Sequence, residues 1–374
     1  MVNEKRLLDE FFELVQIESE TKFEGKIAKV LKDKFTKLGL EVFEDDSAAK
    51  SKHEAGNIFA FLKGNTEGAE TIMFNSHMDT VSPGVGIKPS VKDGWIVSDG
   101  TTILGGDDKA GVASLIEAIR VLKEDKLPHG DIQFVITAGE ESGLAGARAM
   151  DPKNLKGKYG FSLDTGGKVG NFKNQAPARC AVTAKIYGKS AHAGVAPETG
   201  VSAIQIAAKA ISKMPLGRID FETTANIGFI EAKAPLNVVC DYALVGAEAR
   251  STDNTKLEAQ IKAMTEAYEN TAKEMGGKAE VSVEVFYKSF KITEDAPIVG
   301  IVKGAAAKIG RTCKMSPGGG GSDGNIFNGH GLPTVVLAVG YEDCHTKTEK
   351  LSVEELNKSA EMVLAIISEV ASKK

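Results

Sequence analysis

Acidic side chains and histidines follow several strand-like stretches of the sequence at the point where each stretch ends. The residues concerned are His77, Asp79, Glu140, Glu141, Asp164 and His345, and Asp107 stands at the start of a helical pattern. In open α/β sheets, ligands and reacting groups collect just outside the carboxyl ends of the strands. If the strands are parallel, these side chains are therefore expected to converge on one rim of the sheet.

Crowded carboxylates and imidazoles repel one another, or are costly to desolvate, unless a cation offsets their charge. A mixed set of histidine and carboxylate ligands suits Zn²⁺, with Co²⁺ or Mn²⁺ as substitutes. Two such ions, roughly 3.5–4 Å apart, would share one bridging carboxylate and an activated water. The pattern therefore predicts a site for two divalent metal ions.

Each of these residues also has an ordinary structural explanation. Asp107 would cap the helix that follows it, and Asp164 would form an Asx turn with the Thr-Gly-Gly after it. Glu140 and Glu141 would be solvated turn carboxylates, and His345 a surface histidine. The coincidence of all of them at predicted strand ends favours one metal site over several unrelated roles.

Strand and helix patterns alternate over residues 1–175 and again over 291–374, which predicts a mostly parallel sheet with helices on both faces. Residues 45–56 are polar and are expected to form a loop. Between residues 176 and 290 the order becomes β-α-β-β-α-β, which suggests an inserted α+β domain of ferredoxin-like type with an antiparallel sheet. The sequence thus predicts a discontinuous catalytic domain (1–175 and 291–374) and an inserted lid or dimerisation domain (176–290).

Composition excludes several other classes of protein. The 374 residues are 42% hydrophobic and 26% charged, which is ordinary for a soluble globular chain. A net charge of −5 gives no reason to expect a nucleic acid or an anionic membrane as partner, and no apolar run has the length needed to span a bilayer. The first residues resemble an amphipathic helix rather than a signal peptide. Four scattered cysteines are expected to be reduced thiols, so a cytoplasmic location is predicted.

Five short motifs carry the polar residues of the predicted site. They are His77-Met-Asp79-Thr-Val, Gly106-Asp107-Asp108-Lys-Ala-Gly, Glu140-Glu141-Ser-Gly, Leu163-Asp164-Thr-Gly-Gly and Cys344-His345. Together they resemble the M20 family of co-catalytic metallopeptidases, and within it the peptidase T branch. The likeness extends over nearly the whole chain, which implies a zinc exopeptidase-like catalytic domain and an inserted lid.

The resemblance implies a ligand set for the two ions. Asp107 would bridge them, His77 and Asp164 would bind one, and Glu141 and His345 would bind the other. The family pattern also implies a cis peptide bond directly after the bridging aspartate.

The resemblance also implies roles for residues that do not bind metal. Asp79 would orient the metal-bound imidazole before it, and Glu140 would be the general base for a hydroxide held between the ions. His192, Asn237 and Arg250 of the inserted domain would contact the substrate, with Arg250 clamping a carboxylate. Without the resemblance, these three are a loop histidine, a turn residue at the start of a strand and a surface ion pair.

The implied function is hydrolysis of short peptides, most simply release of the N-terminal residue of tripeptides, by a homodimer formed through the inserted domain. A rival with the same metals is an N-acyl amino acid deacylase, a desuccinylase or a carboxypeptidase. A non-catalytic metal-dependent binding protein is a further alternative, but such a protein would not need a base such as Glu140. A phosphatase-like dinuclear hydrolase is disfavoured because no Gly-Lys-Ser/Thr phosphate loop follows the glycine run.

Overall fold

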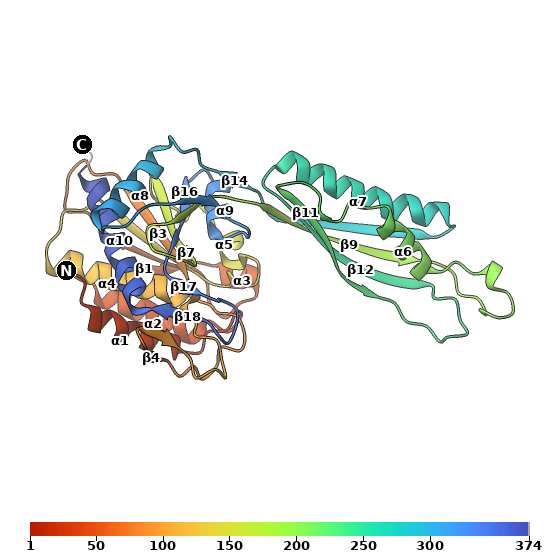
Figure 1. Cartoon of the computed structure of the whole chain (residues 1–374), viewed down its shortest axis with the longest axis horizontal. Helices are drawn as coiled ribbons and strands as arrows, with labels where there is room; N and C mark the ends of the chain where they lie inside the picture. Colours follow the sequence, from red (N-terminus) through yellow and green to blue (C-terminus); the bar gives the residue numbers. More distant parts are fainter. Residues whose placement is uncertain (373–374) are drawn as a thin grey trace. The chain divides into compact units, whose positions relative to one another are not determined.

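The computed structural model describes residues 1–372, and the chain divides into two compact units (Figure 1). The main unit comprises Met1–Gln175, Lys291–Gly318 and the described residues from Ser322 onward. The inserted unit comprises Ala176–Phe290 and Gly319–Gly321.

A nine-stranded sheet forms the centre of the main unit, in the order β1-β2-β6-β3-β7-β16-β8-β14, with β15 beside β8. Its strands are β1 (Glu41–Glu44), β2 (Ile58–Leu62), β3 (Ile72–His77), β6 (Ile132–Thr137), β7 (Tyr159–Thr165), β8 (Phe172–Ala176), β14 (Phe290–Lys291), β15 (Met315–Pro317) and β16 (Thr334–Ala338). The four central strands β6, β3, β7 and β16 are parallel, whereas β1, β2 and β8 add antiparallel pairings toward the edges. The predicted fold class, a mostly parallel α/β sheet, is confirmed.

The central strands are apolar because both of their faces are covered. Every residue of β3, β6 and β16 is buried. Phe74 of β3 pairs in register with Phe134 of β6 and Phe161 of β7. Its ring centroid lies 6.0 Å from that of Phe134 and 5.5 Å from that of Phe161. In the same register His77, the last residue of β3, pairs with Thr137, the last residue of β6.

Helices pack on both sides of this sheet. They are α1 (Glu4–Val15), α2 (Gly25–Lys37), α3 (Ser47–Ser51), α4 (Gly106–Glu124), α5 (Ala145–Ala149), α8 (Pro297–Lys308), α9 (Asp323–Gly329) and α10 (Val353–Ala371). Ser76, near the end of β3, donates to Asp108 at the start of α4. Thr137, the last residue of β6, hydrogen-bonds Asp323 at the start of α9. Ser76 pairs with Ile136, and adjacent residues of a strand point to opposite faces, so α4 and α9 begin on opposite sides of the sheet.

Two features of the main unit differ from the sequence-based expectation. Residues 47–51, expected to lie in a loop, form the short helix α3. A second, four-stranded antiparallel sheet has the order β17-β18-β5-β4. The sequence predicts only one part of it, the apolar stretch Trp95–Val97 as part of a hairpin. Its strands are β4 (Ser90–Lys92), β5 (Trp95–Val97), β17 (Tyr341–Glu342) and β18 (Lys350–Ser352). The loop from β17 to β18 carries His345.

The inserted unit is a five-stranded antiparallel sheet with two helices against one face (Figure 1). Its elements are β9 (Ala178–Tyr187), α6 (Ala203–Ser212), β10 (Gly217–Arg218), β11 (Thr223–Glu231), β12 (Tyr242–Ser251), α7 (Asn254–Glu274) and β13 (Lys278–Tyr287). Apart from the two-residue β10, this is the β-α-β-β-α-β order that the sequence predicts. Burial alternates along β9, because only one face of the sheet is covered by helices.

Within residues 1–372, no helix combines the length and the apolar character that a membrane span requires.

Candidate metal centre

Most of the predicted ligands lie where elements of the main unit end. His77 is the last residue of β3, and Asp164 lies one residue before the end of β7. Glu140 and Glu141 lie in the turn between β6 and α5. His345 adopts a left-handed backbone conformation, with φ of 64°, in the loop between β17 and β18. Parallel strand ends and one hairpin loop therefore supply the cluster.

Asp107 lies between two imidazoles. Its Oδ1 is 3.1 Å from Nε2 of His77, and its Oδ2 is 3.3 Å from Nε2 of His345. The backbone of Asp107 is not helical (φ −82°, ψ 102°), so the regular part of α4 begins after it. The peptide bond between Asp107 and Asp108 is cis, as the family pattern implies. Each carboxylate oxygen thus faces a different histidine.

The remaining ligand candidates complete two groups around this carboxylate. Asp164 Oδ1 lies 3.7 Å from Nε2 of His77, and Glu141 Oε1 lies 3.0 Å from Nε2 of His345. The ligand atoms of His77, Asp107 and Asp164 lie within 4.8 Å of one another. The structure therefore brings together all five residues that the sequence analysis named as ligands.

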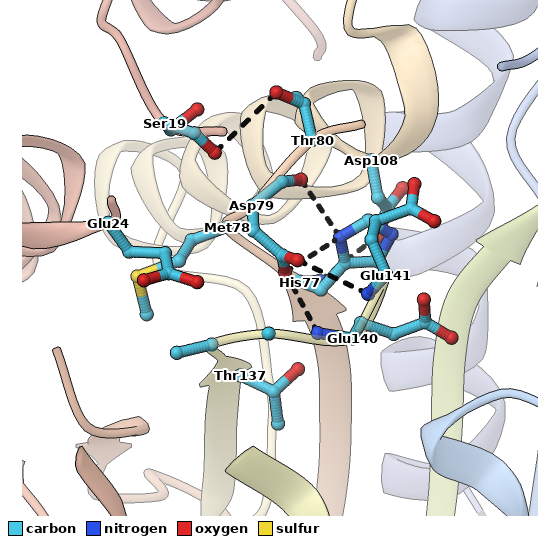
Figure 2. Close-up of polar contacts among 12 residues, drawn as sticks. Ser19, Glu24, His77, Met78, Asp79, Thr80, Asp108, Thr137, Glu140 and Glu141 are labelled. Carbon is cyan, nitrogen blue, oxygen red and sulfur yellow. Dashed lines mark hydrogen bonds and ion pairs between the residues drawn. The ribbon is translucent and has the colours of Figure 1, made fainter. Parts of the chain in front are cut away.

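Asp79 links the histidine to the turn that holds the two glutamates (Figure 2). Its carboxylate accepts the backbone N–H of Glu140 (3.0 Å) and of Glu141 (3.2 Å). His77 Nδ1 lies 3.0 Å from the backbone carbonyl oxygen of Asp79 and 3.4 Å from its Oδ1. Nδ1 therefore carries the hydrogen, which leaves Nε2 directed at Asp107.

The carboxylates of the cluster raise the pKa values of its two histidines. Burial alone would lower the pKa of His77, but hydrogen bonds to Asp107, Asp164 and Asp79 raise it well above the usual value. Hydrogen bonds to Asp107 and Glu141 raise the pKa of His345 to about 10. In both cases the carboxylates around the imidazole favour positive charge at this position.

The pKa of Asp107 is shifted downward, whereas the pKa values of Glu141 and Asp164 are shifted upward. Burial opposes ionisation of Asp107, yet hydrogen bonds from His345 and His77 lower its pKa. Burial raises the pKa values of Glu141 and Asp164. The cluster has more carboxyl groups than its two imidazoles can neutralise.

Glu140 is half-buried beside this cluster. Burial, and next the charge of Asp164, raise the pKa of Glu140 well above its usual value. Figure 2 shows its carboxylate without a contact to the other residues drawn, whereas its backbone is held by Asp79. A carboxylate oxygen of Glu140 lies within 4.8 Å of ligand atoms of His77 and Glu141, so the side chain is placed directly beside the ligand candidates.

Sequence reasoning missed Glu349 and Tyr341. The buried carboxylate of Glu349 accepts the backbone N–H groups of Leu104, Gly105 and Asp107. The hydroxyl of Tyr341 lies 3.5 Å from Asp164 Oδ1. A lone glutamate in a Thr-Glu-Lys stretch carries no local signal, because its role depends on a segment more than 240 residues earlier.

The three predicted substrate residues all lie in the inserted unit. His192 forms an isolated bridge with Val238, and the backbone N–H of Ala193 donates to the carbonyl oxygen of Asn237 at 2.8 Å. Asn237 does not open a strand as expected, because it lies in a turn before β12 begins at Tyr242. The turn residues Pro235–Val238 are closed by a backbone hydrogen bond of their own.

Arg250 lies in β12, and its Nε donates to Glu248 Oε1 at 2.9 Å. Arg179, its partner on β9, contacts the other oxygen of the same carboxylate at 3.0 Å. Both arginines are thus paired with Glu248 within the inserted unit.

The cluster fits two divalent cations. It offers imidazole nitrogens and carboxylate oxygens, the donor set that zinc and related metals accept. Its carboxyl groups exceed its imidazoles in number, so positive charge from bound ions would offset the repulsion. Asp107, whose two oxygens face different histidines, has the arrangement that a bridging ligand needs.

The fold and the cluster together are those of a metallopeptidase: an interrupted α/β unit with carboxylates and imidazoles at the carboxyl rim of its sheet. The sequence model of peptidase family M20/M25/M40 matches residues 73–369. The chain belongs to this family, as its motifs predicted.

The comparisons also place the chain near particular members. It is 58% identical over 371 residues to the Bacillus subtilis protein YqjE, covering 99% of this chain and 100% of that one. The crystal structure of an aminopeptidase PepT from Bacillus cereus is 61% identical, with a TM-score of 0.94 over 99% of this chain and 100% of that one. A tripeptidase structure from Staphylococcus aureus is 48% identical, with a TM-score of 0.96 over the full length of both chains. The predicted likeness to the peptidase T branch is confirmed.

Proposed function

We propose that this chain is a metal-dependent exopeptidase that releases the N-terminal residue of tripeptides. The observation that carries the proposal is the position of Asp107, whose two carboxylate oxygens lie 3.1 Å from His77 and 3.3 Å from His345. Similarity over the full chain to proteins named aminopeptidase PepT and tripeptidase supports the choice of substrate.

The proposed ligand set has Asp107 as the bridge, with His77 and Asp164 on one ion and Glu141 and His345 on the other. Zn²⁺ is the proposed metal because imidazole and carboxylate ligands suit it, and Co²⁺ or Mn²⁺ would serve as substitutes. When bound, a pair of such ions polarises the scissile carbonyl and lowers the pKa of a water molecule.

The chain's own residues then move the proton. Glu140 takes a proton from the attacking water and returns it to the leaving amine. Asp79 supports this role, because its carboxylate holds the N–H groups of both Glu140 and Glu141. The base and the neighbouring ligand are therefore positioned by the same group.

The inserted unit is proposed to act as a lid and as the dimer contact. His192, Asn237 and Arg250 are the candidates for holding the peptide, with the Arg250 guanidinium exchanging Glu248 for a substrate carboxylate. The exposed edge of β11 supports a dimer: β10 pairs with only Ala225 and Thr224, and Phe229 and Ile230 are 46% and 50% exposed. Edge strands of this kind pair readily with another chain.

A cytoplasmic location is part of the same proposal. All four cysteines are free, which fits a reducing compartment.

A metal-reconstituted assay against matched di-, tri- and tetrapeptides, together with N-acyl amino acids, tests the function. We expect release of the N-terminal residue from tripeptides, and no turnover by protein from which a chelator has removed the metal. Cleavage confined to N-acyl amino acids would replace the proposal by the deacylase alternative. Release of the C-terminal residue would replace it by a carboxypeptidase.

A further inference from the structure

The turn that carries Glu140 is held by more than Asp79. Asn57, the residue before β2, accepts the backbone N–H of Ala138 (3.2 Å) and donates to the carbonyl oxygen of Gly146 (2.9 Å). These bonds fix the two ends of the turn. The middle of the turn, at Ser142, is contacted by His53.

His53 lies between α3 and β2, and its side chain is 3% exposed. Its Nδ1 lies 3.1 Å from the carbonyl oxygen of Ser51, and its Nε2 lies 2.9 Å from the hydroxyl oxygen of Ser142. A carbonyl oxygen only accepts, so Nδ1 carries a hydrogen; Nε2 shares a hydrogen bond with the Ser142 hydroxyl, which also donates to the carbonyl oxygen of Gly139 at 3.1 Å. The bond orders a serine that follows Glu141 directly in the chain.

The same ring packs against Gly139, the residue before Glu140. A Cβ at position 139 would lie 2.4 Å from His53 Nε2, and Gly139 has a φ of +65°. Glycine is therefore required there both for its left-handed backbone and for the close approach of the imidazole. His53 thus contacts the turn on both sides of the two glutamates, at Gly139 and at Ser142.

We infer that His53 is a positioning residue for Glu140 and acts through Ser142 and Gly139. This inference rests on the proposed function, in which Glu140 is the base. Catalytic groups must be held to within a fraction of an ångström, and residues behind them supply that restraint. Without His53, the turn keeps its ends at Asn57, its amides at Asp79 and its internal hydrogen bonds to the carbonyl oxygens of Gly139 and Glu140, but it loses the side-chain contact that packs against Gly139 and Ser142.

The predicted consequence is a selective loss of turnover. A misplacement of about 1 Å costs up to roughly 100-fold in rate, so His53→Ala is expected to lower kcat by about 10- to 100-fold. KM should stay within about twofold of the wild-type value, because substrate binding does not need the base. Bound metal is counted in each preparation and kcat is expressed per metal-loaded site, because the proposed ligand Glu141 lies in the same turn as Glu140.

The test compares His53→Ala, His53→Gln, Ser142→Ala and the double variant His53→Ala/Ser142→Ala, all as full-length metal-loaded protein. The side-chain amide of Gln offers both a donor and an acceptor near the position of Nε2, so His53→Gln should keep a hydrogen bond to Ser142 and recover part of the lost kcat. The double variant should be no slower than His53→Ala, because both substitutions break the same hydrogen bond. His129→Ala is the matched control: His129 is also buried, at 5% exposure, and bonds the carbonyl oxygen of Gly130. It should lower thermal stability without lowering kcat.

Two outcomes would overturn the inference. One is a folded His53→Ala protein with wild-type kcat, and the other is a double variant in which the two losses multiply. Glu140→Ala is run in parallel so that the two proposals fail separately. An inactive Glu140→Ala beside a fully active His53→Ala removes only the role of His53, whereas an active Glu140→Ala removes the proposed base itself. If His53→Ala does not fold, His53→Gln and Ser142→Ala still decide the question through kcat.

Discussion

The carboxylate of Glu349 accepts the backbone N–H of Asp107 at 2.9 Å, although 242 residues separate the two in the chain. The same carboxylate accepts the N–H groups of Leu104 and Gly105, both at 2.8 Å. Glu349 also lies four residues after His345, in the same loop. It therefore ties the segment that presents Asp107 to the loop that presents His345.

Glu349→Gln is expected to weaken metal binding by about 10- to 100-fold, as is usual when a group that supports metal ligands is lost. The amide places a donor where an oxygen now accepts backbone N–H groups, so at least one of the three bonds is broken. Competitive titration of metal-free protein with a chromophoric chelator measures the change. The control is Glu342→Gln, an exposed glutamate of β17 that pairs with Lys350. Equal affinity of the Glu349→Gln and wild-type proteins would contradict this account of Glu349.

Glu140→Gln should retain both ions while kcat falls by about 10²- to 10⁴-fold, the usual contribution of a general base. The amide has nearly the same shape but cannot take up the proton. Steady-state kinetics and elemental analysis of the same preparation separate the two effects. The exposed Glu67→Gln is the control. Loss of metal together with activity would show that Glu140 is a ligand rather than the base.

Mixing two inactive variants tests whether His192 acts across a dimer. If each site needs the partner subunit's His192, subunit exchange between His192→Ala and Glu140→Ala proteins restores one site per mixed dimer. Random mixing would then give up to about a quarter of the wild-type activity. The measurement is peptide turnover after exchange has been verified with subunits of different mass. No recovery in confirmed mixed dimers would place His192 outside the partner's site.

Glu24 gives the expected pH dependence of stability. Its side chain is buried, and burial raises its pKa from 4.5 to about 7. The folded state therefore binds this proton more tightly than the unfolded state, so the stabilisation is complete below pH 4.5 and is lost as the pH rises through about 7. Glu24→Gln keeps an acceptor for the N–H of Lys22 but carries no charge to desolvate.

At pH 8 the free energy of unfolding of Glu24→Gln should exceed that of the wild type by about 1–3 kcal/mol. The difference should vanish near pH 4.5. Denaturant titrations of both proteins in metal-free form measure it, with the exposed Glu67→Gln as control. A variant that is less stable than the wild type at both pH values would show that the Glu24 carboxylate is stabilising when charged.

Much of the fold could be predicted because its signals are local. The apolar run before His77 and the alternating pattern of β9 specify strands by burial on two faces or on one. The helix α3 escaped prediction because its five residues are too few for a periodic pattern. It is held in place by tertiary contacts with α5.

The ligand candidates could be found because each follows a recognisable strand, loop or motif. Glu349 and His53 could not be found in this way. Their neighbours in sequence are polar loop residues, and their contacts are with backbone or side-chain groups distant in the chain. Asn237 and Arg250 were placed by resemblance, and the strand expected to begin at Asn237 begins only at Tyr242. Their substrate roles stay predictions.

Metal stoichiometry tests the central claim most directly. Metal-free protein is titrated with Zn²⁺ by isothermal titration calorimetry, and bound zinc is counted by elemental analysis for wild type, Asp107→Ala and Asp164→Ala. The account predicts two ions per wild-type chain, one retained by Asp164→Ala, and less than one by Asp107→Ala, because only Asp107 serves both ions. Two tightly bound ions in Asp107→Ala, or none in the wild type, would contradict it.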